Sequence, residues 1–116
     1  MNLDNPVVKL CIAGTQAEFQ GLIDTAHALY QQAWDAAQDD YDACIAAHYL
    51  ARHQQNLHER LYWNQIALEK ANAVTDNSVQ EFYPSLFLNM GQSYELLGNI
   101  HEAKRYYTLA AKITNE

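Results

Sequence analysis

Proline, glycine and basic residues are all scarce in this 116-residue sequence, and each scarcity excludes a class of protein. Two prolines and four glycines are too few for an all-β domain, whose many turns depend on these residues. Seven Lys and Arg against 14 Asp and Glu give a net charge of −7, so no basic surplus is present to bind a phosphate backbone or an anionic lipid surface. We therefore expect neither a nucleic-acid partner nor a membrane partner.

Long apolar runs and paired cysteines are also missing. The apolar run over residues 7–12 is interrupted by Lys9 and is far shorter than the ~20 residues that span a bilayer. Cys11 and Cys44 stand alone, without a CxxC motif, and we expect both to be reduced and buried on apolar helix faces. These absences predict a cytoplasmic protein.

What the sequence does contain is helical periodicity over a single domain, residues 1–116. Asn5-Pro6 suits a helix start, and polar or glycine-containing breaks divide the rest into about six predicted helices. Residues 75–83 allow two interpretations. We favour one long helix that starts at Asp76 or Ser78 and kinks at Pro84; the alternative is a short separate turn over residues 79–83 that ends before the proline.

An internal repeat organises these helices. The pattern of Ala, Tyr and Ala at steps of four and three recurs 77 residues further along the chain, and two glycines recur at the same offset. The matching residues are Ala26, Tyr30, Ala33, Gly14 and Gly21 in the first copy, and Ala103, Tyr107, Ala110, Gly91 and Gly98 in the second. Because Ala67 divides the offset into 34 and 43, the sequence predicts three helix–turn–helix units, at 7–40, 41–74 and 84–116, with residues 75–83 inserted.

The last unit resembles the tetratricopeptide repeat. The residues that carry the resemblance are Phe87, Met90, Gly91, Tyr94, Gly98, Ala103, Tyr107 and Ala110. The first unit matches well but has Ala17 in a tyrosine position. The resemblance implies an all-α, right-handed solenoid of antiparallel helix pairs, in which small residues let the two helices of a pair approach closely and each pair stacks on the next.

The middle unit departs from this pattern. His48 falls in the glycine position, Arg60 in the small-residue position that faces it, and Asn64 in the aromatic position. A register shifted by one residue would place Ala47 in the glycine position instead, and the sequence leaves both registers open.

Proteins of this family usually bind partners in the concave groove lined by the first helix of each unit. The resemblance therefore implies a non-catalytic scaffold that binds a protein or peptide. The groove residues that it implies are Asp42, Ile45, Tyr49, Arg52 and His53 in the middle unit, Ser85, Leu88, Gln92 and Glu95 in the last, and Val8, Thr15 and Glu18 in the first. The alternative is a solvated polar face with no ligand.

A polar pocket is a second candidate site. His48, Asn64 and Asn89 are polar groups in or near positions that are normally small or aromatic, and such groups destabilise a fold unless they are hydrogen-bonded. They form either an internal network that stabilises the middle unit or a pocket that opens to the groove. In the second case the protein would be a regulatory domain that senses a small ligand through His48, Arg52, His53 and Asn89.

The sequence predicts no catalytic residue, no metal site and no cofactor. His48 and His53 are five residues apart, whereas two ligands on one helix face are three or four apart, and nothing beside Cys11 or Cys44 would activate a thiol.

A homodimer is a further prediction. Because the sequence ends just after the last helix, Tyr106, Leu109 and Ile113 are expected to leave an apolar patch that a second copy covers.

Overall fold

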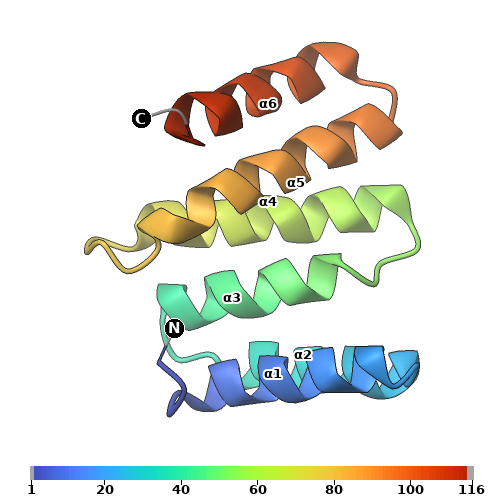
Figure 1. The fold of residues 1–116 in the computed structure, drawn as a ribbon, viewed down its shortest axis with the longest axis vertical. Coiled ribbons are helices and arrows are strands. Elements are labelled where there is room, and N and C mark those ends of the chain that lie inside the picture. Colours follow the sequence, from blue (N-terminus) through green and yellow to red (C-terminus); the bar gives the residue numbers. More distant parts are fainter. Residues whose placement is uncertain (1, 115–116) are drawn as a thin grey trace.

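Residues 2–114 are described by the computed structural model, and they form six α-helices and one 3₁₀ turn, with no strand. The helices are α1 (Pro6–Phe19), α2 (Ile23–Ala36), α3 (Asp40–Ala51), α4 (Leu57–Ala73), α5 (Tyr83–Leu96) and α6 (Ile100–Thr114). They pack as successive antiparallel pairs, α1/α2, α3/α4 and α5/α6 (Figure 1). The predicted all-α class with six helices is confirmed. The predicted third unit runs to residue 116, and its last two residues lie outside the described part.

Equivalent helices begin at constant spacings. The first helices of the pairs begin at residues 6, 40 and 83, and the second helices begin at residues 23, 57 and 100. Both series advance by 34 and then by 43 residues, the two spacings found in the sequence. This regularity is consistent with a helical repeat, and it keeps His48 level with Gly14 and Gly91. Ala47, which the register shifted by one residue would place in the glycine position, is fully buried in the cluster that contains Ala67 and Ala71.

The turns within the first and last pairs share one geometry. Gly21 has φ 78° and Gly98 has φ 85°, a region that residues with a Cβ rarely adopt. A backbone hydrogen bond of 2.9 Å spans five residues in both turns, from Leu22 to Ala17 and from Asn99 to Tyr94. The middle pair has a longer connection, residues 52–56, which ends at Asn56, whose side chain accepts from the His58 and Glu59 amides at the start of α4.

The core runs through α3, which is buried on most of its surface. Ile45, Ala46 and Leu50 face the first pair, while Cys44 and Ala47 pack with α4 and the start of α5. Trp34 and Trp63 pack against both halves of the core and meet edge to face at 5.1 Å. The middle pair therefore supplies the hydrophobic contact that joins the two ends of the molecule.

The segment before α5 differs from the favoured sequence prediction. A 3₁₀ turn over Gln80–Phe82 precedes α5, which begins at Tyr83 with Pro84 in its first turn. The long helix kinked at Pro84 is therefore wrong, and the structure is closer to the separate turn, although Tyr83 already belongs to the helix. Two physical causes explain this: Pro84 lacks only an N–H that the first turn leaves unpaired, and Val79 buries its side chain in the core.

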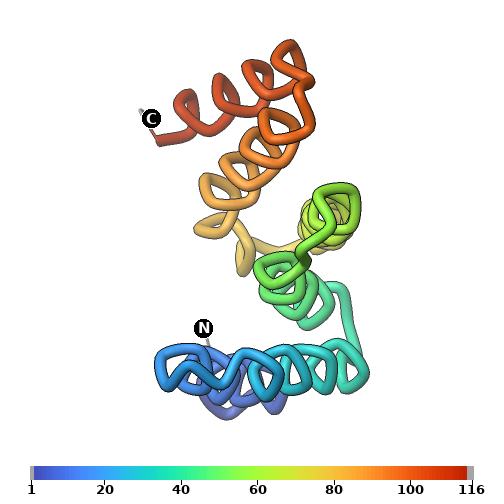
Figure 2. The backbone as a smooth tube through the Cα atoms, turned by 90° about the vertical axis from the view of Figure 1, so that its right-hand side faces the viewer, coloured from blue at the N-terminus to red at the C-terminus, as the bar shows by residue number. Residues whose placement is uncertain are grey.

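The helix pairs follow a bent path (Figure 2). The first pair and α6 reach toward the same side of the molecule, and α4 lies on the outside of the bend. The shortest dimension is 21 Å, about two helix diameters, so the molecule is two helices thick. None of the described helices has the length and the apolar character needed to cross a membrane.

Candidate functional site

Glu18 on α1 joins the first helix pair to the end of α3. Its carboxylate accepts hydrogen bonds from the Tyr30 hydroxyl and from Arg52 Nη2, the latter at 3.1 Å, and His53 Nε2 lies 2.7 Å from Oε1. The Tyr30 ring stacks on Tyr49 and on His53, with centroid distances of 5.2 and 5.8 Å. The predicted groove residues Tyr49, Arg52 and His53 thus come together. They contact Glu18 or Tyr30, however, and the three of them do not line one open cleft.

The charges of this contact follow from its surroundings. Burial raises the pKa of Glu18, but the contacts with Tyr30 and His53 and the positive charge of Arg52 outweigh it, so the pKa of Glu18 lies below its ordinary value. Burial and the hydrogen bond to Glu18 raise the pKa of Tyr30 to about 12. Near neutral pH, Glu18 is therefore ionised and Tyr30 keeps its proton.

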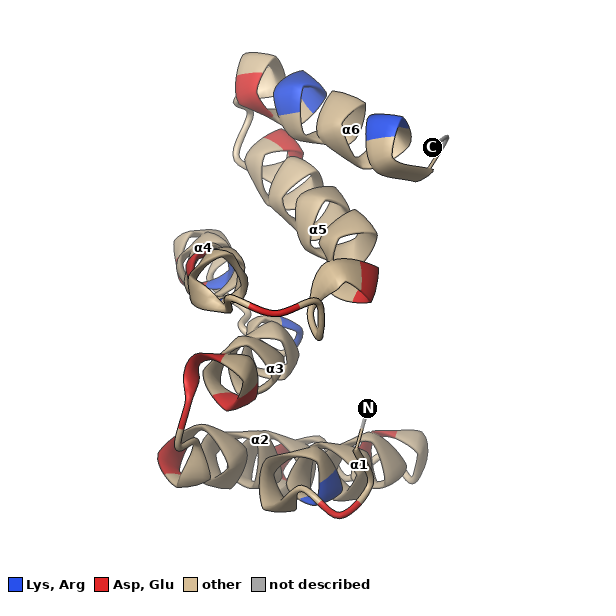
Figure 3. Cartoon of the chain, turned by 90° about the vertical axis from the view of Figure 1, so that its left-hand side faces the viewer, with Lys and Arg blue, Asp and Glu red and all other residues tan. Residues whose placement is uncertain are grey.

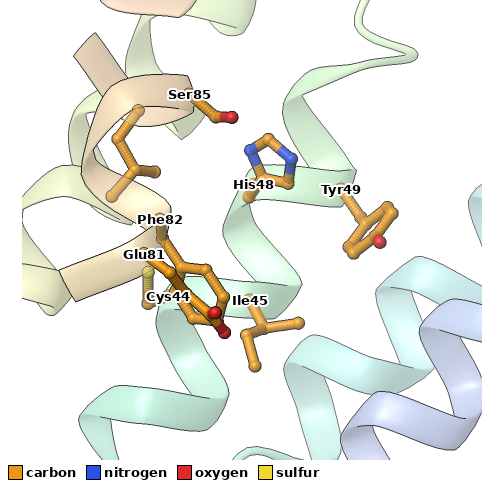
Figure 4. A pocket seen from close by; sticks show the side chains of 8 residues that line it. Cys44, Ile45, His48, Tyr49, Glu81, Phe82 and Ser85 are labelled. Atoms are coloured by element: carbon orange, nitrogen blue, oxygen red, sulfur yellow. The ribbon is translucent and has the colours of Figure 1, made fainter. Parts of the chain in front are cut away.

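A cavity of about 180 Å³ lies between α3 and the start of α5, and we call it the Ser85 hollow (Figure 4). Its lining residues are Cys44, Ile45, His48, Tyr49, Glu81, Phe82, Ser85 and Leu86. Cys44, Ile45 and Leu86 are buried and apolar, while Ser85 and Glu81 are exposed at its edge. The hollow therefore combines an apolar interior with polar groups where it meets solvent. Phe82 and Leu86 were not among the predicted site residues, because only the fold brings the start of α5 against α3.

The predicted polar pocket divides into two separate contacts. His48 Nδ1 lies 3.3 Å from Asn89 Nδ2, and Asn64 Nδ2 donates to Ser93 Oγ at 2.9 Å. Burial lowers the pKa of His48, and the charge of Arg52 lowers it further, so the imidazole is neutral near pH 7 and its Nδ1 can accept from the Asn89 amide. These two bonds link the middle pair to α5.

A second cavity, of about 200 Å³, lies beside these contacts, and we call it the Arg60 hollow. Its lining residues are Ala51, Arg52, Arg60, Asn64, Asn89 and Gln92. Of the predicted residues, it brings together Arg52 and Gln92 from the expected groove and Asn64 and Asn89 from the expected polar pocket. Arg60 was not predicted as a site residue; its only signal in the sequence is an arginine where the outer units have alanine.

Other predicted groove residues have structural contacts. Asp42 is buried and accepts hydrogen bonds from Asn5 Nδ2 at 2.8 Å and from the Gln38 amide at 3.2 Å, so it ties α3 to the chain before it. Glu95 accepts from the Tyr107 hydroxyl at 2.9 Å within the last pair. The expectation that Val8 lines a groove is wrong, because its side chain is completely buried in the core.

Both cysteines are free and buried. Burial raises the pKa of Cys11 to about 12 and that of Cys44 to about 11, so both are protonated thiols near neutral pH and poor nucleophiles. Within residues 2–114, no three His, Cys, Asp or Glu side chains are grouped to hold a metal ion.

The apolar patch predicted on the last helix is only partly exposed. The Tyr106 ring packs on Tyr94 and Phe87, at centroid distances of 5.8 and 6.2 Å, and the Arg105 guanidinium lies 4.4 Å from its centroid. Leu109 is half-buried, and Ile113 is 36% exposed. The face available to a second copy is therefore narrower than the sequence suggested.

Comparisons of this chain with protein-family models, with curated proteins and with solved structures found no match.

Proposed function

We propose that this protein is a right-handed solenoid of three tetratricopeptide-like helix pairs that binds an extended segment of a partner protein and catalyses no reaction. Three features support the repeat: the helix starts advance by 34 and 43 residues, the outer pairs share one turn geometry, and both outer pairs have a glycine against a tyrosine ring. Each pair is apolar on both sides and must stack to bury that surface.

The Ser85 hollow is the observation that carries the binding proposal. Its volume of about 180 Å³ suits one apolar side chain rather than a cofactor, since cofactor and drug-sized sites span roughly 300–1,000 Å³. The Ser85 hydroxyl and the neutral His48 ring stand beside it and can exchange hydrogen bonds with the backbone of a bound segment. We therefore propose an extended peptide that places a large aliphatic or aromatic side chain between Ile45 and Phe82.

The state of the ionisable groups supports a binding role over catalysis. Cys44, which lines the hollow together with His48, is a protonated thiol because burial raises its pKa to about 11. The Nδ1 atom of His48 is occupied by Asn89, and burial keeps the ring neutral. An activated nucleophile needs a base within hydrogen-bond reach.

A cytoplasmic location is part of the same proposal and rests on the two reduced cysteines.

A peptide-display selection against the folded protein tests the proposal. We expect the enriched sequences to share a large apolar residue and to lose binding to Ser85→Trp, in which an indole fills the hollow from an exposed position. Thr108→Trp, at an exposed position of α6, is the matched control and should bind as the wild type does. Equal binding to both variants, or selection without a shared apolar residue, would contradict the proposal.

A small-ligand sensor is the second candidate function, and the Arg60 hollow favours it. That cavity gathers Arg52 and Asn89, two of the four residues expected for a sensing pocket, whereas His48 lines the other hollow and His53 contacts Glu18. If this function is correct, at least one metabolite in a thermal-shift screen should raise the melting temperature of the wild type.

A homodimer through Tyr106, Leu109 and Ile113 stays a prediction. Light scattering that gives a strict monomer at high protein concentration would reject it.

A further inference from the structure

The outer helix pairs are closed by the same three-residue contact. In the first pair the Tyr30 ring covers Gly14 and its hydroxyl donates to Glu18; in the last pair Tyr107 covers Gly91 and donates to Glu95. A Cβ at Gly91 would lie 2.7 Å from the Tyr107 ring, so the ring packs directly against the glycine and leaves no room for a side chain there. We call this arrangement the Gly–Tyr–Glu contact.

The middle pair has changed every position of the Gly–Tyr–Glu contact. At the spacings set by the helix starts, the glycine corresponds to His48, the tyrosine to Asn64 and the glutamate to Arg52. Arg60 in turn corresponds to the buried alanines Ala26 and Ala103. Three of the four replacements, Arg52, Arg60 and Asn64, line the Arg60 hollow together with Asn89 and Gln92 from α5. The outer pairs thus have a glutamate and a tyrosine ring in contact at this place, whereas the middle pair has a cavity lined by two arginines.

The two arginines keep donors that can serve a ligand. Arg52 uses Nη2 for Glu18, and Arg60 uses Nε and Nη2 for the backbone carbonyl of Gln54, at 3.2 and 3.0 Å. A guanidinium has five N–H groups, so donors remain on both side chains. Among residues 2–114, no carboxylate lies within 4 Å of Arg60 to neutralise it.

The position of Arg60 strengthens the positive potential. It lies four residues into α4, near the helix end whose dipole already favours an anion. Lys and Arg occupy few places along the chain (Figure 3), and two of the seven basic residues line this one cavity. A half-buried cation near a positive helix end is stabilised when an anion is bound beside it.

We propose that the Arg60 hollow binds a phosphate group, carried either by a free phosphorylated metabolite or by a phosphorylated residue of a partner. The donors come from the end of α3, from α4 and from α5 and approach the cavity from different directions. This arrangement suits the three terminal oxygens of a phosphate better than the planar pair of a carboxylate. The guanidinium of Arg60, which has no carboxylate beside it within the described part of the chain, supplies a positive charge to the negative phosphate monoester, and Arg52, whose charge is shared with Glu18, supplies further N–H donors. Because the Ser85 hollow is a different cavity, this inference can fail while the proposed function holds, and the reverse is also possible.

The direct test is an NMR titration with inorganic phosphate at constant ionic strength, with acetate as the competing anion. We expect saturable shifts of the Arg60 side chain and of the Asn64 and Asn89 amides with phosphate, and binding to acetate that is weaker by at least ~10-fold. Equal affinity for the two anions, or shifts that do not saturate with phosphate, would overturn the proposal.

A charge variant at the edge of the cavity separates binding from folding. Gln92 is exposed, so Gln92→Glu should add a negative charge beside the ligand without loss of packing and weaken phosphate binding by ~10-fold or more. Gln32→Glu, at an exposed position of α2, changes the net charge equally and should leave binding unchanged. Equal loss in both variants would contradict the assignment. Arg60→Gln should abolish the saturable shifts of the Asn64 and Asn89 amides. Its NMR spectrum without ligand shows whether the variant is folded.

Titrations with a phosphoserine peptide, with its unphosphorylated form and with a sugar phosphate identify the source of the phosphate. Tighter binding of a phosphoserine peptide than of inorganic phosphate or a sugar phosphate supports a partner residue, and tighter binding of the sugar phosphate supports a metabolite. A phosphoserine peptide that binds no better than its unphosphorylated form, together with no binding of the sugar phosphate, would reject both sources.

Discussion

The outer helix pairs and the middle pair are all antiparallel helix pairs, but they differ in side-chain chemistry at equivalent positions. In the outer pairs a tyrosine ring covers a glycine, and its hydroxyl is held by a glutamate. In the middle pair the corresponding positions hold His48, Asn64 and Arg52, and their polar groups bond to α5 and to α1. The tyrosine–glutamate hydrogen bond of each outer pair therefore lies within that pair, whereas the corresponding residues of the middle pair bond to neighbouring pairs.

Both the Ser85 hollow and the Arg60 hollow lie between the middle pair and the α5 segment. The Arg60 hollow is lined by Arg52, Arg60 and Asn64, which stand at positions that are glutamate, alanine and tyrosine in the outer pairs. Of the replaced residues, only His48 lines the Ser85 hollow. A ring excludes both water and ligands, while amides and guanidiniums leave space and supply donors. We therefore expect stability to depend most on the outer contacts and ligand binding to depend on the middle residues.

The largest effect is expected at Tyr30, which is completely buried. Tyr30→Ala removes the ring over Gly14 and the donor to Glu18, and we expect a loss of about 3–5 kcal/mol in the free energy of unfolding. Urea unfolding followed by circular dichroism measures it. Tyr62→Ala, at a side chain that is 52% exposed, should lose under ~1 kcal/mol. Similar losses in the two variants would mean that the first pair does not depend on its ring.

A smaller effect is expected at Gly91. Gly91→Ala places a Cβ 2.7 Å from the Tyr107 ring, and the overpacking should destabilise the protein by about 1–3 kcal/mol. The double variant with Tyr107→Leu should lose less than the sum of the two single losses, because the smaller side chain makes room for the Cβ. Additive losses in this cycle would show that the two residues are not in contact.

At the middle pair, Asn64→Ala should lose about 1–2 kcal/mol, because the buried Ser93 hydroxyl then lacks its partner. We expect Ser93→Ala to add little in the Asn64→Ala background, since the bond is already absent. Urea unfolding of the four proteins of the cycle measures this coupling. If Asn64→Ala lost as much free energy of unfolding as Tyr30→Ala, the expectation that stability depends most on the outer pairs would be wrong.

The smallest effect is expected at Glu18, which connects the two kinds of pair. Glu18→Gln should lose about 1 kcal/mol at neutral pH, between the values for exposed ion pairs and for buried charged hydrogen bonds. Because the pKa of Glu18 is lowered from 4.5 in the folded protein, its contribution is complete above that ordinary value and disappears as the pH falls through the folded value.

The wild type and Glu18→Gln should therefore converge in stability at acid pH, as urea midpoints between neutral and acid pH will measure. Tyr30→Phe removes one of the donors to Glu18 and should reduce the pH dependence without abolishing it. A stability difference between wild type and Glu18→Gln that stays constant with pH would contradict a lowered pKa of Glu18 in the folded protein.

Much of the fold could be predicted from the sequence, while little of the site could. The helix starts follow from local signals such as Asn5-Pro6 and Gly98-Asn99, which act within one turn of the chain. The segment before α5 was predicted less well, because the burial of Val79 against the middle pair is a contact between distant residues. The same reason applies to Asp42, whose bond to Asn5 joins residues 37 positions apart.

The scarcity of proline, glycine and basic residues, the 34- and 43-residue spacings and the departures at His48, Arg60 and Asn64 are all properties of the sequence by itself. They determine the helical class and identify the middle unit as unusual, because periodicity and backbone preference are local. Only the tertiary structure decided that Arg52 and Arg60 share a cavity with Asn89 and Gln92, and that His53 and Arg52 meet Glu18. Which side chains share a space depends on how α3, α4 and α5 pack against one another, and that packing is set by contacts between residues far apart in the chain.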